Sequence, residues 1–241
     1  MNPTLSVQQG LNPLRLLQSQ LSQVLRNHGH SDSANQIDAC NRNQPCRSRR
    51  CTLCTSLRTI AQRAHLKRQV KDWWTRCRRP VMFAITPTVA DSCIDHRRRA
   101  LDVVSSTRAL IRMLPVSTWF ACIETVPSEY GDSSLRTHTH VLAVLDSPPS
   151  GRGYVTESEW QDRLHNKWQA TCPVIAESVH AKRLSTVDDA LSWSCYSTKD
   201  ANLQDSAIRT QAALRDPELF MAASDALWNV PRFFGPMSKS N

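Results

Sequence analysis

The chain has 241 residues, 40% of them hydrophobic, and its 30 Lys and Arg exceed its 21 Asp and Glu to give a net charge of +9. This length allows one sizeable core with an appendage, and the hydrophobic fraction excludes an intrinsically disordered chain. The apolar runs are far shorter than the roughly 20 residues of a membrane-spanning helix, and the N-terminus lacks the pattern of a secretory signal. We therefore expect a soluble, cytoplasmic protein, whose charge favours a polyanionic partner such as nucleic acid or an anionic membrane surface.

The first 39 residues are expected to form a helix and a linker. The spacing of Leu and Val over residues 14–25 places these side chains on one helical face, which predicts a short amphipathic helix. The sequence NHGHSDSANQ that follows it has the composition of a polar linker.

A cysteine cluster, CNRNQPCRSRRCTLC, begins at residue 40. Cys51 and Cys54 have the spacing of a zinc knuckle, and Cys40 and Cys46 can complete a four-thiolate site. Zinc binding supplies roughly 10–16 kcal/mol of apparent free energy, which is enough to fold a segment with little core of its own. A structural zinc is the favoured interpretation, and a disulfide framework is the less favoured one.

The positive charge is concentrated in residues 40–80, which hold twelve basic side chains and one acidic one, a net charge of +11. From Thr55 to about Arg79 the pattern predicts a helix with a basic outer face that Pro80 ends. Such a face is either solvated or contacts phosphates, and the charge density favours phosphates. The DNA-binding candidates are Arg47, Arg49, Arg50, Arg58, Arg63, Lys67 and Arg68. Residues 40–79 are treated as one zinc knuckle and basic helix.

Beyond residue 80 the predicted elements alternate. Apolar, β-prone runs predict strands over 81–88, 117–126, 137–145 and 173–184, and amphipathic patterns predict helices over 94–114, 156–171 and 185–200. Ser185 and Asp188 have the spacing of a capping box at the start of the last helix. The order predicts an α+β fold with a largely antiparallel central sheet flanked by helices. We expect this domain to span residues 80–204, and residues 205–241 to be a C-terminal extension that packs on it.

A metal site is predicted where two of these strands meet. His138 and His140 point the same way from a strand, so both imidazoles can reach one ion. Glu124 is the only ionisable group of the preceding strand, and a buried carboxylate needs a cation or a donor. If the two strands form a hairpin, the three groups suit Mg²⁺ or Mn²⁺. The alternatives are two hydrogen-bonded histidines and a Glu124 paired with an arginine.

A nucleophile is predicted on the last helix, in SWSCYSTKD. Tyr196 and Lys199 are three residues apart and share a face, and Asp189 lies on the same stripe seven residues before Tyr196. A lysine and a metal-polarised phosphate favour the phenolate of a tyrosine, whose ordinary pKa is about 10. Because this spacing is common, an ordinary amphipathic helix remains the alternative.

Taken together, these motifs resemble those of the rolling-circle replication initiators of small plasmids, which belong to the HUH endonuclease superfamily. The resemblance lies in an ordered set over roughly residues 40–200: CRSRRCTLC with a basic helix, FAITPT, IETV with THTHVLAVL, and YSTK. It implies an HUH endonuclease-like nuclease domain over residues 80–204, preceded by a cysteine-rich zinc-binding segment.

The resemblance also implies a site-specific single-strand DNA endonuclease and strand transferase. Glu124, His138 and His140 match metal ligands, Tyr196 the nucleophile and Lys199 the lysine one helical turn later. Tyr196 would attack a single-stranded or hairpin nick site at the plasmid double-strand origin, forming a 5′-phosphotyrosyl link and a 3′-hydroxyl primer. The implied cofactors are Mg²⁺ or Mn²⁺ and a structural Zn²⁺. The implied partners are origin DNA, host helicase and host polymerase, with no membrane partner, in the bacterial cytoplasm.

Two positions depart from the family pattern. Plasmid relatives often carry an acidic residue one helical turn before the tyrosine, where this chain has Ser192; Asp189 or Asp188 is the substitute we consider. Thr52 stands where a proline is common. The alternative functions are a transposase or relaxase of the same chemistry, and a non-catalytic, zinc-dependent DNA-binding regulator.

Overall fold

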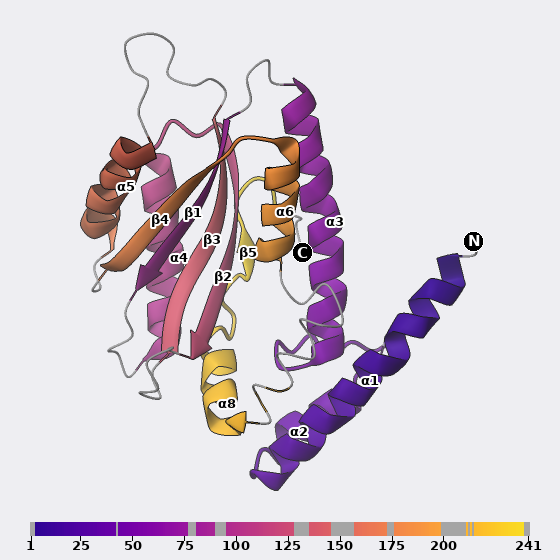
Figure 1. Ribbon diagram of the computed structural model, residues 1–241. Coiled ribbons are helices and arrows are strands. Elements are labelled where there is room, and N and C mark those ends of the chain that lie inside the picture. Colours follow the sequence, from indigo (N-terminus) through magenta and orange to yellow (C-terminus); the bar gives the residue numbers. More distant parts are fainter. Residues whose placement is uncertain are drawn as a thin grey trace. The chain divides into compact units, whose positions relative to one another are not determined.

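The computed structural model describes residues 3–41, 43–76, 81–89, 95–127, 135–145, 157–172, 176–198, 211, 213 and 215–238 (Figure 1). The chain divides into two compact units. Residues 1–63 and 198–224 form one, called the cysteine unit here, and residues 64–197 and 225–241 form the other, called the sheet unit. The boundary at residues 63 and 64 falls inside helix α3 (Thr52–Arg76).

Helices α1 (Pro3–Asn27) and α2 (Ser31–Asp38) supply much of the core of the cysteine unit. Leu21 and Leu25 of α1 are buried in one cluster with Ala34 and Ile37 of α2. The polar linker predicted after the first helix is wrong over α2. Two apolar side chains three residues apart are enough to give a short helix one buried face, although they are too few to stand out among polar neighbours.

The sheet unit contains a five-stranded antiparallel sheet with strand order β4-β1-β3-β2-β5. Its strands are β1 (Val81–Val89), β2 (Thr118–Pro127), β3 (Leu135–Leu145), β4 (Ala176–Leu184) and β5 (Phe233–Phe234). The predicted α+β class with a largely antiparallel sheet is therefore confirmed. The short β5, which pairs with β2 at Ala121 and Cys122, is not predicted by the sequence pattern.

The remaining described helices are α4 (His96–Arg112), α5 (Glu157–Thr171), α6 (Val187–Ser197) and α8 (Pro217–Ala226). Helices α4 and α5 lie on one face of the sheet, and α6 lies on the other (Figure 1). Among the described residues, no helix has the length and apolarity needed to cross a membrane.

Strand β3 is buried on both faces, which explains its uninterrupted apolar run. Because side chains alternate along a strand, Val141 and Ala143 enter the cluster covered by α4 and α5. Leu142 and Val144 instead join Leu66 of α3 and other side chains on the α6 face. By the same alternation, His138 and His140 belong to the α6 face.

Gly235, directly after β5, has a left-handed backbone conformation with φ +100°, and an added Cβ would lie 2.7 Å from the Trp119 carbonyl oxygen. We expect Gly235→Ala to lower the free energy of unfolding by about 1–3 kcal/mol, because it adds steric overlap to backbone strain. Urea denaturation followed by circular dichroism measures this loss. Gly29→Ala is the control, since Gly29 also has a positive φ but no atom within 4 Å of an added Cβ. A smaller loss for Gly235→Ala than for Gly29→Ala would contradict the account.

Candidate functional site

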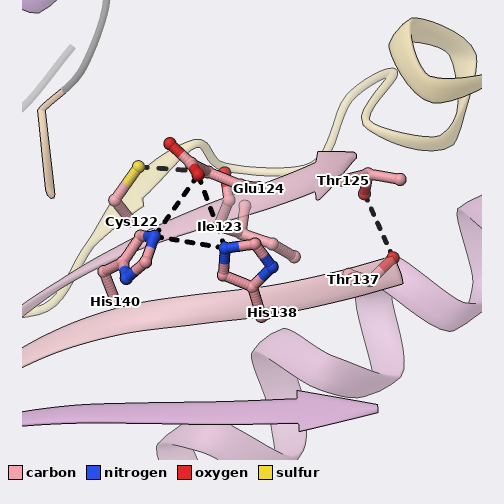
Figure 2. Close-up of polar contacts among 7 residues, drawn as sticks. All are labelled: Cys122, Ile123, Glu124, Thr125, Thr137, His138 and His140. Carbon is pink, nitrogen blue, oxygen red and sulfur yellow. Dashed lines mark hydrogen bonds and ion pairs between the residues drawn. The ribbon is translucent and has the colours of Figure 1, made fainter. Parts of the chain in front are cut away.

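The predicted metal ligands meet on the β2–β3 hairpin (Figure 2). The register pairs Glu124 of β2 with His138 of β3, and Cys122 with His140. All three candidate ligands therefore project from the same face of two adjacent strands. Thr125 and Thr137, a neighbouring pair in this register, share a hydrogen bond of 3.1 Å between their hydroxyl groups. Thr139, on the opposite face from the histidines, is hydrogen-bonded to Thr107 of α4 at 3.0 Å.

The three side chains converge on one point. His138 Nε2 lies 3.1 Å from His140 Nε2, and Glu124 Oε2 lies 3.4 Å from His138 Nε2 and 3.3 Å from His140 Nε2. Their side chains are only 11% (Glu124), 15% (His138) and 3% (His140) exposed. As in the first of the two alternatives, the histidines lie within hydrogen-bond distance of each other. Two imidazole nitrogens also face the Glu124 carboxylate.

This donor set fits one divalent cation. Ligand atoms about 2.1 Å from an octahedral ion are separated by about 3 Å at adjacent positions, close to the three separations between the imidazole and carboxylate atoms. Two imidazoles and one carboxylate on one side of an ion leave other coordination positions open. Imidazole is a common ligand of transition metals, whereas carboxylate and water also bind Mg²⁺ and Mn²⁺, so the donor set is of mixed character.

Tyr196 lies beside this Glu–His–His cluster. Its ring centroid is 5.1 Å from that of His140, with the two ring planes at 76°. The side chain projects from α6 and is 55% exposed, so a large substrate has access to it. The structure thus brings together a tyrosine and a candidate cation site that are 56 residues apart in the chain.

Asp189, the candidate auxiliary acid, lies in the first turn of α6. Its carboxylate accepts hydrogen bonds from the backbone N–H groups of Ser185 and Thr186, and the Thr186 hydroxyl accepts one from the Asp189 N–H. The capping box therefore consists of Thr186 and Asp189, and the predicted pair Ser185 and Asp188 is wrong by one residue. The hydrogen bond to the Thr186 side chain, followed by that to its backbone, lowers the pKa of Asp189. Seven residues of helix, about 10 Å, separate it from Tyr196.

Ser192 and Lys199 are the other two positions that the sequence singled out near Tyr196. Ser192, one turn before Tyr196, is exposed. Lys199, the predicted partner of Tyr196, lies outside the described residues.

The four predicted zinc ligands also converge, in the cysteine unit. Cys40, Cys46, Cys51 and Cys54 have their sulfur atoms within 4.8 Å of one another. Cys54 Sγ lies 3.3 Å from Cys40 Sγ and 3.7 Å from Cys46 Sγ. Four sulfurs at the usual Zn–S distance of about 2.3 Å are about 3.8 Å apart in a tetrahedron, so the cluster can hold a metal such as zinc.

The thiols of this cluster do not ionise independently. Hydrogen bonds from Cys46 and then Cys51 lower the pKa of Cys54 to about 2. The pKa of Cys51 is raised, because its thiol is hydrogen-bonded to Cys46 and Cys54 and is desolvated by burial. One thiolate is thus stabilised by its neighbours, whereas the raised pKa of Cys46 and of Cys51 means that a bound cation would have to displace their protons.

The predicted DNA-binding side chains differ in availability. Arg63 donates hydrogen bonds to the hydroxyl and carbonyl oxygens of Thr198, and Arg50 donates to the Ser33 hydroxyl at 2.6 Å. Their guanidinium groups therefore already have protein partners. Arg47 and Arg68 are exposed, whereas Arg49, Arg58 and Lys67 are half-buried.

Comparisons of the chain with family models, curated proteins and solved structures found no match. The case for a function therefore rests on the two side-chain clusters and on their surroundings.

Sequence reasoning missed Trp193 as a component of the site. Its ring centroid lies 6.3 Å from that of His140, and the ring is half-buried. Trp193 and Tyr196 are three residues apart on α6, so both rings reach His140 from one helical face. That spacing was the available signal, but it becomes informative only once α6 is known to lie on the histidine face.

Proposed function

We propose that the chain is a replication initiator that nicks one DNA strand at a plasmid double-strand origin and primes rolling-circle replication. The observation that carries this proposal is the position of Tyr196, whose ring lies 5.1 Å from that of His140 in a cluster that fits a divalent cation. An exposed tyrosine beside such a site is suited to attack on a phosphodiester. The resemblance to plasmid initiators supplies the biological setting.

In the proposed reaction the Tyr196 oxygen attacks the phosphorus of the scissile phosphodiester. The phenol loses its proton, a bond forms between Tyr196 and the 5′ phosphate, and the bond to the 3′ oxygen breaks. That oxygen takes up a proton and becomes the 3′-hydroxyl that a polymerase extends. A divalent cation held by Glu124, His138 and His140 would polarise the phosphate and stabilise the negative charge that develops on it. Lys199 is proposed to neutralise the same phosphate.

The cysteine unit is proposed to recognise origin DNA. A segment ordered by zinc and followed by a basic helix would present positive charge to DNA. Arg47 of the cysteine unit is exposed, and so is Arg68, which lies farther along α3 in the sheet unit. Contacts of this kind release counterions, so binding should weaken steeply as salt increases. Host helicase and polymerase are the expected partners for unwinding and for extension of the 3′ end.

A non-catalytic, zinc-dependent DNA-binding regulator is the second candidate, and the cysteine cluster is the observation that favours it. Both candidates predict zinc and DNA binding. Only the initiator predicts that the Glu–His–His cluster binds a cation needed for strand cleavage.

We expect His138→Ala and His140→Ala each to lower Mn²⁺ affinity at least about 100-fold and to abolish nicking of single-stranded DNA from the neighbouring replicon. Each change removes one of three ligands, which leaves too few to hold the ion. Isothermal titration calorimetry measures the affinity, and denaturing gels of end-labelled oligonucleotides measure nicking.

His180→Ala is the matched control, because His180 is an exposed histidine on the edge strand β4 and does not belong to the cluster. It should keep both Mn²⁺ binding and nicking. Nicking that persists in the presence of a chelator, or in both cluster variants, would show that the proposed metal site is wrong.

A further inference from the structure

A second charged group lies on the same sheet as the Glu–His–His cluster. Arg136 precedes His138 by two residues on β3, so strand alternation directs both side chains to the same face. Arg136 forms a two-point ion pair with Glu177 of β4, in which Nε donates to Oε2 at 3.3 Å and Nη2 donates to Oε1. The pair therefore spans β1, which lies between β3 and β4.

The backbone is irregular at this point. The β1–β4 register pairs Thr88 with Ser178 but Val89 with Ala176, so Glu177 is the extra residue of a β-bulge. Bulges frequently occur beside functional sites, where they redirect a side chain. Here the bulge accompanies a carboxylate that reaches across a strand to Arg136.

The ion pair is only partly shielded from solvent. The side chains of Arg136 and Glu177 are 23% and 28% exposed, so water and a ligand can reach the pair. An arginine can exchange partners instead, because its planar fork binds a phosphate with the same two-point geometry as a carboxylate.

We propose that Arg136 binds a phosphate next to the scissile one in a single DNA strand, and that Glu177 holds its guanidinium group in place until DNA arrives. Two residues of strand, about 6.8 Å, separate Arg136 from His138, a spacing comparable to that of successive phosphates in an extended single strand. The inference rests on the proposed function, since it assumes that the strand crosses the Glu–His–His cluster. It adds a substrate-binding residue and a carboxylate that competes with the DNA.

The test is a comparison of Arg136→Gln and Glu177→Gln in the full chain, with a 12-nucleotide oligothymidylate as a sequence-neutral single strand. Dissociation constants are measured by fluorescence anisotropy at several salt concentrations. Arg136→Gln should weaken binding by about 5–10-fold and reduce the slope of log affinity against log salt by about 0.7, the loss of one phosphate contact. Glu177→Gln should strengthen binding, because it removes the competing carboxylate. Arg136→Lys should fall between wild type and Arg136→Gln, because it keeps the charge and loses the fork.

Arg183→Gln is the matched control. Arg183 is an exposed arginine on β4 that pairs with Phe83 in the register and so projects to the opposite face of the sheet. It should leave the salt slope unchanged. Weaker binding in both Arg136→Gln and Glu177→Gln, with a common fall in melting temperature, would identify a structural ion pair and overturn the inference. An unchanged slope in Arg136→Gln and Arg136→Lys would overturn it as well.

A second readout places the contact along the DNA. On an oligonucleotide whose nicked bond has been mapped, single phosphates next to that bond are replaced by uncharged methylphosphonate. One replacement should slow nicking by wild type but not slow Arg136→Gln further. Slowing of the two proteins by the same factor at every position would contradict the contact. Failure of the proposed function is distinct, since it is a lack of nicking and covalent linkage, whereas the oligothymidylate test measures binding alone.

Discussion

Replacement of Tyr196 by Phe is expected to abolish nicking and covalent attachment to DNA, with a rate loss of at least about 10³-fold. The change removes one oxygen, and with it the atom that forms the new bond to phosphorus. Because the side chain is 55% exposed, the free energy of unfolding should change by less than about 0.5 kcal/mol. Mn²⁺ binding and DNA binding should also be retained, since Tyr196 does not belong to the Glu–His–His cluster. Covalent DNA is measured as a slower band on a denaturing protein gel.

The chain offers complete controls for this experiment, because it contains three tyrosines. Tyr130→Phe and Tyr154→Phe should nick and link DNA as wild type does. Nicking by Tyr196→Phe at the wild-type rate would refute the mechanism and favour cleavage by a different nucleophile, such as water.

Replacement of Cys54 by Ser is expected to eliminate bound zinc and to unfold the cysteine unit. Cys54 Sγ has two other cluster sulfurs within 3.7 Å, so its loss removes a central ligand. Structural zinc contributes roughly 10–16 kcal/mol of apparent binding free energy. Most folded domains are only about 5–15 kcal/mol more stable than their unfolded state, so they cannot lose this contribution and stay folded. Elemental analysis should give one zinc per wild-type chain and none in the variant, and circular dichroism should show loss of helix.

The pH dependence of zinc binding follows from the same chemistry. The bound form needs deprotonated sulfurs, and protons compete with the metal, so affinity should fall as pH falls. Cys172→Ser is the control, because Cys172 is a buried cysteine of the sheet unit and lies outside the cluster. It should retain one zinc. Purified wild-type protein without zinc would contradict the account.

Local patterns were sufficient for most of the sheet and its helices. The apolar runs of β1 to β3 and the helical spacing of α4 to α6 are strong signals, since each spans many residues. A two-residue strand such as β5 carries no periodic signal and forms only because β2 offers a partner edge. The helix α2 was missed for a related reason, since its buried face consists of Ala34 and Ile37.

The sequence predicted which residues form the candidate site, but it did not predict how they are arranged in space. Alternation puts His138 and His140 on one face, but only the hairpin register shows that Glu124 is directly opposite His138. Which side of the sheet α6 covers is a tertiary property, and it decides that Tyr196 meets His140. The Arg136–Glu177 pair depends on a bulge that strand patterns do not reveal.

The most direct test of the central claim is identification of the amino acid that becomes linked to DNA. Wild-type protein is incubated with Mn²⁺ and single-stranded DNA from the neighbouring replicon, digested with nuclease and protease, and analysed by mass spectrometry. The account predicts a nucleotide joined through its 5′ phosphate to the peptide that contains Tyr196. A linkage at another residue, or nicked DNA with no linked peptide, would contradict it.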